Sequence, residues 1–176
     1  GCAGDPGCSG AAWESLLIDG GPGPTYLLAL KPRLEALRKL HRLSASQSLS
    51  IELVVLTHTD EDHLDGLVQL FNELRKAKEQ SHPAPYRAEG IWYNSFDDVI
   101  QNKEVAAIQS LANSPSPEIR ALVAGVPSGR VLRDDADYLV VPINQDFDTF
   151  AMRKAKKAPQ VSFDDLSLTV LSPSAA

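Results

Sequence analysis

Two histidines and three acidic residues lie within one short segment of the chain, directly after an apolar stretch. The segment His58-Thr59-Asp60-Glu61-Asp62-His63 offers imidazole nitrogens and carboxylate oxygens, and residues 51–57 before it are mostly apolar. An apolar run of that length predicts a buried strand. In α/β proteins, the turns at the carboxyl ends of such strands carry the ligand sites. We therefore predict a metal site here, with a charged surface turn as the alternative.

The mixture of ligand types narrows the choice of metal. Imidazole combined with carboxylate suits zinc, manganese or iron better than magnesium or calcium. We expect His58, Asp60, Asp62 and His63 to bind one or two zinc ions, with manganese or iron as alternatives. A bound ion of this kind lowers the pKa of water toward ~7, which produces a nucleophile at neutral pH.

The spacing of these residues resembles a known motif. Residues 58–66 are similar to the second motif of the metallo-β-lactamase superfamily, H-x-[HD]-x-D-H-x-x-G. The variant with Asp at the third position most resembles the metallo-β-lactamase-type domain of competence (DNA-uptake) proteins and their soluble relatives. Residues 16–21 resemble the first motif of the superfamily, and residues 90–94 and 166–173 resemble later strands. The resemblance implies an α/β fold, the αββα sandwich, either complete or only its N-terminal half.

The same resemblance implies a function and roles for single residues. It implies a metal-dependent hydrolase that cleaves phosphodiester bonds, in a small molecule or in nucleic acid, through a metal-activated water. Asp62 would be the catalytic residue, because its family counterpart both binds metal and orients that water. Asp19 would form a hydrogen bond with a ligand imidazole and fix its tautomer. The alternative for Asp19 is a turn cap before two glycines.

A complete site in this superfamily also needs later ligands, which are a histidine, a bridging aspartate and a final histidine. The only histidine after His63 is His82, which we expect to be an exposed loop residue. The chain is therefore either the N-terminal part of a longer protein or a shortened member with an incomplete site. Two other functions stay open: a non-catalytic binding module, and thioester, glyoxalase-like or iron redox chemistry at the same site.

Composition sets the remaining expectations. The 176 residues, 43% of them apolar, predict one globular domain over residues 13–176 after a flexible terminus at 1–12. No apolar stretch reaches the ~20 residues of a membrane span, and no secretory signal is visible, so we expect a cytoplasmic protein without a membrane partner. The net charge of −6 argues against non-specific binding of polyanions.

The hydrophobic pattern predicts alternating strands and helices. We expect strands at 15–19, 51–57, 91–94, 138–143 and 166–171, and helices at 27–42, 63–78, 99–111 and 118–123. The first helix should bury Leu27, Leu30, Leu34, Leu37 and Leu40 on one face, and its basic residues should lie on a solvated face.

Overall fold

A parallel sheet organises the molecule. The protein is described by a computed structural model that covers residues 15–94, 115–147, 151, 160–163 and 166–170. The strands β1 (Leu16–Ile18), β3 (Leu53–Val55) and β5 (Ile91–Trp92) form a three-stranded parallel sheet in the order β1-β3-β5. The first two apolar runs therefore lie side by side in one sheet, and the carboxyl ends of all three strands lie at the same edge.

The second apolar run is divided between two strands. β2 (Leu49–Ile51) pairs in parallel with β4 (Tyr86–Ala88), and Glu52 separates β2 from β3. The amide of Glu52 bonds to the carbonyl of Ser15, so the run changes partner at this residue. The predicted strand at 51–57 is therefore correct in type but wrong in extent, since β3 ends at Val55 and residues 56–60 form a loop.

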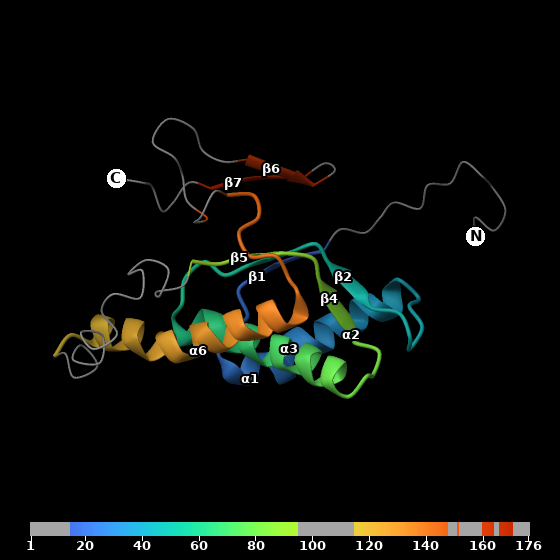
Figure 1. The fold of residues 1–176 in the computed structure, drawn as a ribbon, viewed down its shortest axis with the longest axis horizontal. Coiled ribbons are helices and arrows are strands. Elements are labelled where there is room, and N and C mark those ends of the chain that lie inside the picture. Colours follow the sequence, from blue (N-terminus) through green and yellow to red (C-terminus); the bar gives the residue numbers. More distant parts are fainter. Residues whose placement is uncertain (1–14, 95–114, 148–150, 152–159, 164–165, 171–176) are drawn as a thin grey trace.

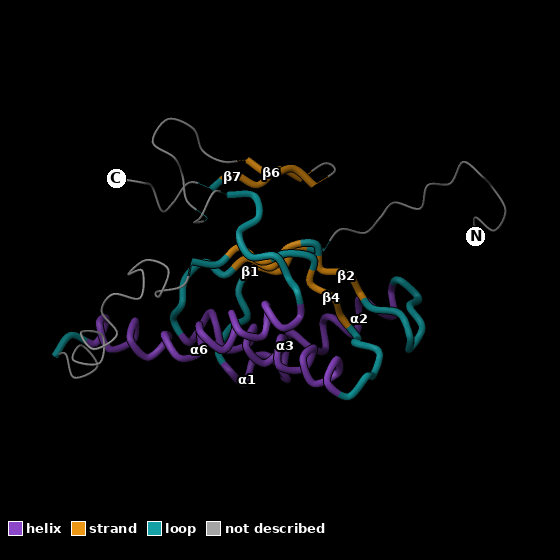
Figure 2. The backbone as a smooth tube through the Cα atoms, in the orientation of Figure 1, coloured by secondary structure: helices purple, strands orange, loops and turns teal. Residues whose placement is uncertain are grey.

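The helices lie on one face of the sheet, and a β-hairpin lies on the other (Figures 1 and 2). The helical elements are α1 (Gly23–Thr25), the π-helix η1 (Tyr26–Leu30), α2 (Lys31–Leu40), α3 (Glu61–Glu79) and α6 (Pro117–Leu139). The hairpin consists of the antiparallel strands β6 (Gln160–Phe163) and β7 (Leu166–Thr169). The fold is thus α/β, and β7 falls within the strand predicted at 166–171.

The core is built around α3, which begins two residues before the predicted helix and ends one residue after it. Its apolar face is fully buried at Leu64, Leu67, Leu70 and Phe71, as the helical spacing predicts. These side chains pack against the sheet and belong to one continuous cluster with Val54 of β3. This packing fixes the first turn of α3 at the carboxyl ends of the strands.

The π-helix changes which residues of the preceding helix are buried. The amide of Lys31 bonds to the carbonyl of Tyr26, five residues earlier, which widens this turn and shifts the upstream residues around the axis. Tyr26 is buried in consequence, while Leu27 is 63% exposed. The prediction that Leu27 is buried is therefore wrong. The prediction for Leu40 is also wrong, since this residue is 67% exposed at the end of α2.

Helix α6 extends far beyond the predicted helix at 118–123 and replaces most of the predicted strand at 138–143. It continues through Pro127, because Leu132 and Ala136 are fully buried and hold it in the core. The left-handed residue Val140 follows the helix. Of the predicted strand, only Ile143 forms a β-bridge, to Ile91. Tertiary packing therefore outweighs the β-branched composition of this segment.

Two further expectations concern polar residues and residues outside the described ranges. Arg38 is buried, contrary to the expectation of a solvated basic face, whereas Arg33 and Lys39 on the same helix are exposed.

The predicted terminus at 1–12 and the predicted helix at 99–111 lie outside the described residues. No helix in the described part of the chain has the length and apolarity needed to cross a membrane.

Candidate metal centre

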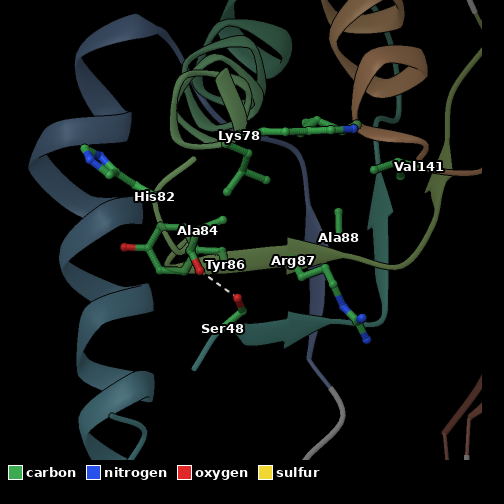
Figure 3. Close-up of a pocket in the computed structure, with 10 residues that line it drawn as sticks. Ser48, Lys78, His82, Ala84, Tyr86, Arg87, Ala88 and Val141 are labelled. Atoms are coloured by element: carbon green, nitrogen blue, oxygen red, sulfur yellow. Dashed lines mark hydrogen bonds between the residues drawn. The ribbon is translucent and has the colours of Figure 1, made fainter. Parts of the chain in front are cut away.

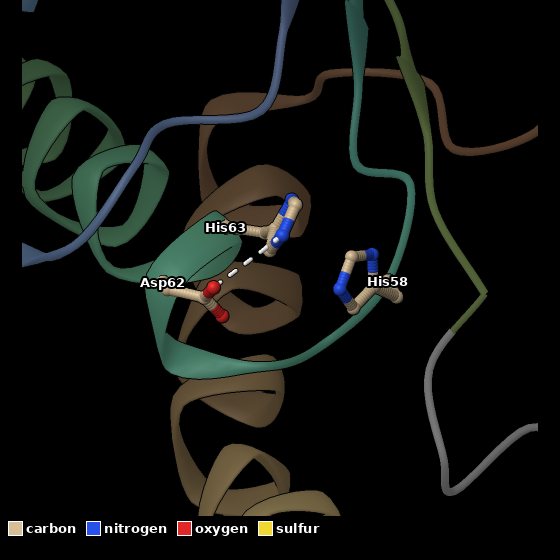
Figure 4. A group of neighbouring side chains, drawn as sticks. All are labelled: His58, Asp62 and His63. Atoms are coloured by element: carbon tan, nitrogen blue, oxygen red, sulfur yellow. Dashed lines mark ion pairs between the residues drawn. The ribbon is translucent and has the colours of Figure 1, made fainter.

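The predicted ligands lie on the connection from β3 to α3. His58 is in the loop at 56–60, and Asp62 and His63 are in the first turn of α3 (Figure 4). The rings of His58 and His63 face each other, with their centroids 3.6 Å apart. The location is the carboxyl edge of the parallel sheet, where the sequence predicts a site.

Three of the four predicted ligands converge. One ring nitrogen of His58, one of His63 and one carboxylate oxygen of Asp62 all lie within 4.8 Å of one another. Oδ2 of Asp62 is 3.6 Å from Nε2 of His63. The side chains are open to solvent, with exposed fractions of 49% for His58, 71% for Asp62 and 29% for His63. The group is therefore accessible to an ion and to a substrate.

Asp60 lies beside this group but is not part of it. Its Oδ2 is 3.8 Å from Nε2 of His58. Asp60 is the N-cap residue of α3, yet its side chain makes no capping hydrogen bond. The usual use of aspartate at this position is to accept a backbone N–H. The Asp60 carboxylate is thus not engaged in capping, and it faces the imidazole of His58.

Asp19 holds the imidazole of His63. Its Oδ2 is 2.8 Å from Nδ1 of His63, which is the contact that the sequence predicts for Asp19. This hydrogen bond raises the pKa of His63, because the protonated ring is stabilised by the carboxylate. With Nδ1 donating to Asp19, Nε2 of His63 is left to accept a proton or an ion. The role of Asp19 behind a metal ligand stays a prediction.

Thr57 connects the two histidines, and the sequence analysis gave it no role. Its Oγ1 donates to Oδ2 of Asp19 at 2.8 Å and lies 3.0 Å from Nδ1 of His58. Its amide donates to Oδ1 of Asp19, also at 2.8 Å. One hydroxyl thus orients the carboxylate behind His63 and the ring of His58. The sequence signal that could have identified Thr57 is its position as a polar residue directly before the predicted ligand His58.

Two glycines bring Asp19 close to the helix. A Cβ atom on Gly66 would lie 1.9 Å from the carbonyl oxygen of Gly20, and a Cβ on Gly20 would lie 2.2 Å from the amide of Leu67. The amide of Gly20 donates to the carbonyl of His63 at 2.7 Å. Asp19 itself has φ +56, a left-handed conformation that Asp tolerates better than most residues. These contacts explain why glycine stands at position 20, directly after Asp19, and at position 66, after the ligand segment.

Helix α6 supports the ligand loop from the other side. A Cβ on Gly125 would lie 2.0 Å from the carbonyl oxygen of Thr59, so only glycine allows this approach. Thr59 is buried by the contact. Gly125 was not predicted as a site residue, because the helix predicted at 118–123 ends before it. An isolated glycine within a helical segment was the available signal.

The donor set fits one zinc ion. Catalytic zinc sites use three protein ligands and leave a fourth position open, and the described residues offer one group of three donors. Two atoms bound to one zinc ion at about 2.0–2.2 Å each lie less than about 4.4 Å apart, and the three donor atoms here lie within 4.8 Å of one another. The expected later histidine is not supplied by His82, which lies at the far end of α3 beside Ala84 and Tyr86.

A cavity at that far end shows a different arrangement. It has a volume of about 280 Å³ and is bordered by Lys78, His82 and Arg87. These three side chains extend in different directions (Figure 3). Lys78 donates to the carbonyl of Tyr138, and Arg87 pairs with Glu89. Their polar groups do not converge on one point, in contrast to the group at His58.

Comparisons with known proteins add no family to this description. No protein-family model, curated protein or solved structure matches the chain. The geometry of the site therefore carries the functional interpretation.

Proposed function

We propose that the protein is a metal-dependent hydrolase that binds one zinc ion through His58, Asp62 and His63. The observation that supports this most strongly is that both imidazoles are held at Nδ1 by protein groups. Asp19 holds His63 and Thr57 holds His58. Metal-binding histidines characteristically have such a partner on the second ring nitrogen. The resemblance to the metallo-β-lactamase superfamily supports the same proposal.

All three side chains would bind the metal, and Asp62 would in addition accept a proton. Zinc, when bound, would supply Lewis acidity and lower the pKa of a water molecule toward ~7. Asp62 has one oxygen facing His63 and is well exposed, so its second oxygen can accept a proton from an attacking water. That water adds to the acyl or phosphoryl centre, the bond to the leaving oxygen breaks, and the proton passes to the leaving group. Asp60, beside His58, is placed to act as an additional ligand.

The resemblance favours phosphodiesters as the bonds that are cleaved, and a carboxylic ester is tested beside them. The test uses bis(p-nitrophenyl) phosphate and p-nitrophenyl acetate with the chelated protein, the zinc-loaded protein and the manganese-loaded protein. We expect turnover only with metal and its loss in Asp62→Ala. A matched control is Glu61→Ala, which removes an exposed carboxylate from the same turn.

Two outcomes would contradict the proposal in different ways. Equal turnover with and without metal would exclude a metal-dependent mechanism. Stoichiometric zinc binding without turnover of either substrate would favour the non-catalytic binding module, since three ligands would then serve binding alone.

A further inference from the structure

A second cavity opens beside the candidate metal centre, at the carboxyl edge of the sheet. It has a volume of about 370 Å³, which lies in the range of small-molecule sites, about 300–1,000 Å³. Its wall comes from the ends of β1, β3 and β5 on one side and from the hairpin strand β7 on the other. The apolar part of this wall is Ile18, Val55, Leu56, Trp92, Leu168 and Val170.

Thr57 joins this cavity to the metal centre. It lines the cavity, and its Oγ1 contacts both Asp19 and His58. Ile18, which immediately precedes Asp19, is 54% exposed and also lines the cavity. A ligand in the cavity would cover part of this exposed apolar side chain and remove it from water. A molecule in the cavity would therefore have one end next to the proposed zinc ligands.

The wall of the cavity is rigid on the sheet side. The indole of Trp92 is nearly fully buried and donates to Oδ2 of Asp146 at 2.8 Å. The ring of Phe147 packs edge-on against it, with the centroids 5.1 Å apart. Asn94 at the rim is bonded to the backbone of Ala151 in both directions. The shape of this side is thus preformed, which favours binding of a ligand of defined size.

The charges around the cavity favour a ligand whose bound part is uncharged. None of the described residues that line it is charged. The described segments that build the cavity and the metal centre (16–21, 55–66, 91–94, 151 and 167–170) contain no lysine or arginine. They do contain Asp19, Asp60, Glu61, Asp62 and Asp65. A nucleic acid needs cationic side chains that neutralise its phosphates, and these described segments supply none.

We infer that the substrate is a small molecule with an uncharged apolar acyl or alkyl group, which occupies the cavity between Ile18, Trp92 and Leu168. The inference rests on the proposed hydrolase, and it selects small apolar esters over nucleic acid. Each buried methylene group strengthens binding by about fourfold. Affinity and kcat/KM should therefore rise with the length of the apolar chain until the cavity is full.

The test has a binding arm that does not depend on turnover. The Trp13→Phe protein keeps Trp92 as its only tryptophan, and its fluorescence reports on the cavity. We titrate the chelated protein with hexanamide and with acetamide, and we expect hexanamide to bind at least about tenfold more tightly. Leu168→Asp and Ile18→Ser, on two different elements, should each remove this preference. Leu28→Asp, at an exposed leucine outside the cavity, should leave it unchanged.

The kinetic arm compares p-nitrophenyl hexanoate, p-nitrophenyl acetate and a short single-stranded oligonucleotide with the zinc-loaded protein. We expect kcat/KM to be highest for the hexanoate, and we expect Leu168→Asp to bring the ratio of hexanoate to acetate close to one. No zinc-dependent turnover together with tight hexanamide binding would end the hydrolase proposal while supporting the apolar site. Equal affinities for the two amides, or cleavage of the oligonucleotide in preference to both esters, would overturn the inference.

Discussion

Two regions of the helical layer carry charged and polar side chains, but they use them differently. At the start of α3, His58, Asp62 and His63 converge with their outer atoms open to solvent. Along the opposite part of the helical layer, the side chain of Arg38 is buried and donates to the backbone carbonyls of Ser44, Gln47 and Pro85. The donor atoms of the first group are therefore open to a ligand, whereas the guanidinium of Arg38 is engaged with backbone carbonyls.

Two tyrosines also donate to carboxylates in this helical layer. We refer to Arg38, these tyrosines and their partners as the closed network. Tyr86 donates to Glu35 at 2.6 Å and Tyr26 donates to Glu73 at 2.5 Å. Burial, reinforced by these carboxylates, raises the pKa of both phenols, so they stay neutral donors at physiological pH. Polar groups that satisfy one another hold a fold together. Groups that converge without satisfying one another are available to a ligand, and this contrast distinguishes the candidate site from the other polar clusters.

The backbone under the open site should be the most sensitive to change. Gly66→Ala would place a methyl group 1.9 Å from the carbonyl oxygen of Gly20, and backbone cannot move aside easily. We expect a loss of at least about 3 kcal/mol in the free energy of unfolding, measured by urea denaturation. The control is Gly23→Ala, whose new methyl group meets only side chains, at 3.3 Å or more. It should change stability by less than about 1 kcal/mol. Equal effects would show that the close contact is not rigid.

The closed network should affect stability without affecting metal. Arg38→Met removes the donors to three backbone carbonyls. A hydrogen bond from a charged donor contributes about 1.5–3 kcal/mol, and the three here are only partly buried, so we expect a loss of about 3 kcal/mol in unfolding free energy. Zinc affinity should be unchanged at a temperature where the variant is folded. Arg33→Met, at an exposed position on the same helix, should be neutral in both measurements. A large change in zinc affinity for Arg38→Met would mean that the two regions are coupled.

Changes at the candidate metal centre should lower zinc affinity and leave the unfolding free energy almost unchanged. His58→Ala removes one of three donors, so we expect zinc affinity to fall by more than about 100-fold, beyond the loss typical of an outer partner. Because the ring is about half exposed, stability of the metal-free protein should change by less than about 0.5 kcal/mol. His82→Ala removes an exposed histidine from the other end of α3 and should change neither quantity. Isothermal titration calorimetry separates these outcomes.

Asp19→Asn should have the smallest effect on metal binding, because it leaves all three donors in place. The amide cannot accept the Nδ1 proton of His63 as strongly, so we expect zinc affinity to fall by about 10–100-fold. Glu61→Gln, in the same turn but outside the contact, is the control. A loss as large as that of His58→Ala would indicate that Asp19 is itself a ligand.

The metal-free protein offers a second readout of Asp19. Since Asp19 raises the pKa of His63, their pairing stabilises the folded state fully below the unfolded-state pKa of about 6.5. The contribution is lost as the pH rises through the folded-state pKa. Asp19→Asn should therefore lower the pKa of His63 and flatten this part of the stability profile. An unchanged pKa would contradict the hydrogen bond seen in the structure.

Local sequence patterns were enough to predict that the side chains of the candidate metal centre lie together, because the residues are close in the chain. His58, Asp62 and His63 follow one apolar run, and Asp19 follows the neighbouring strand. The failures came from effects that only tertiary structure reveals. The π-turn at Tyr26–Leu30 buries Tyr26 in place of Leu27. The contact of Gly125 with Thr59 lies on a helix that extends far beyond the predicted end at residue 123. Arg38 was predicted to be a surface residue, because its sequence pattern does not reveal that its guanidinium donates to carbonyls of the following loop and of Pro85.

The central claim is that His58 and His63 bind the same zinc ion, and imidazole nitrogen NMR tests it directly. The chain has four histidines, which are His41, His58, His63 and His82. On titration of the full chain with zinc, we predict that one ring nitrogen of His58 and Nε2 of His63 shift together and saturate at one equivalent. His41 and His82 should not shift. Shifts at His41 or His82 alone, or none at His58 and His63 after one equivalent, would contradict the claim.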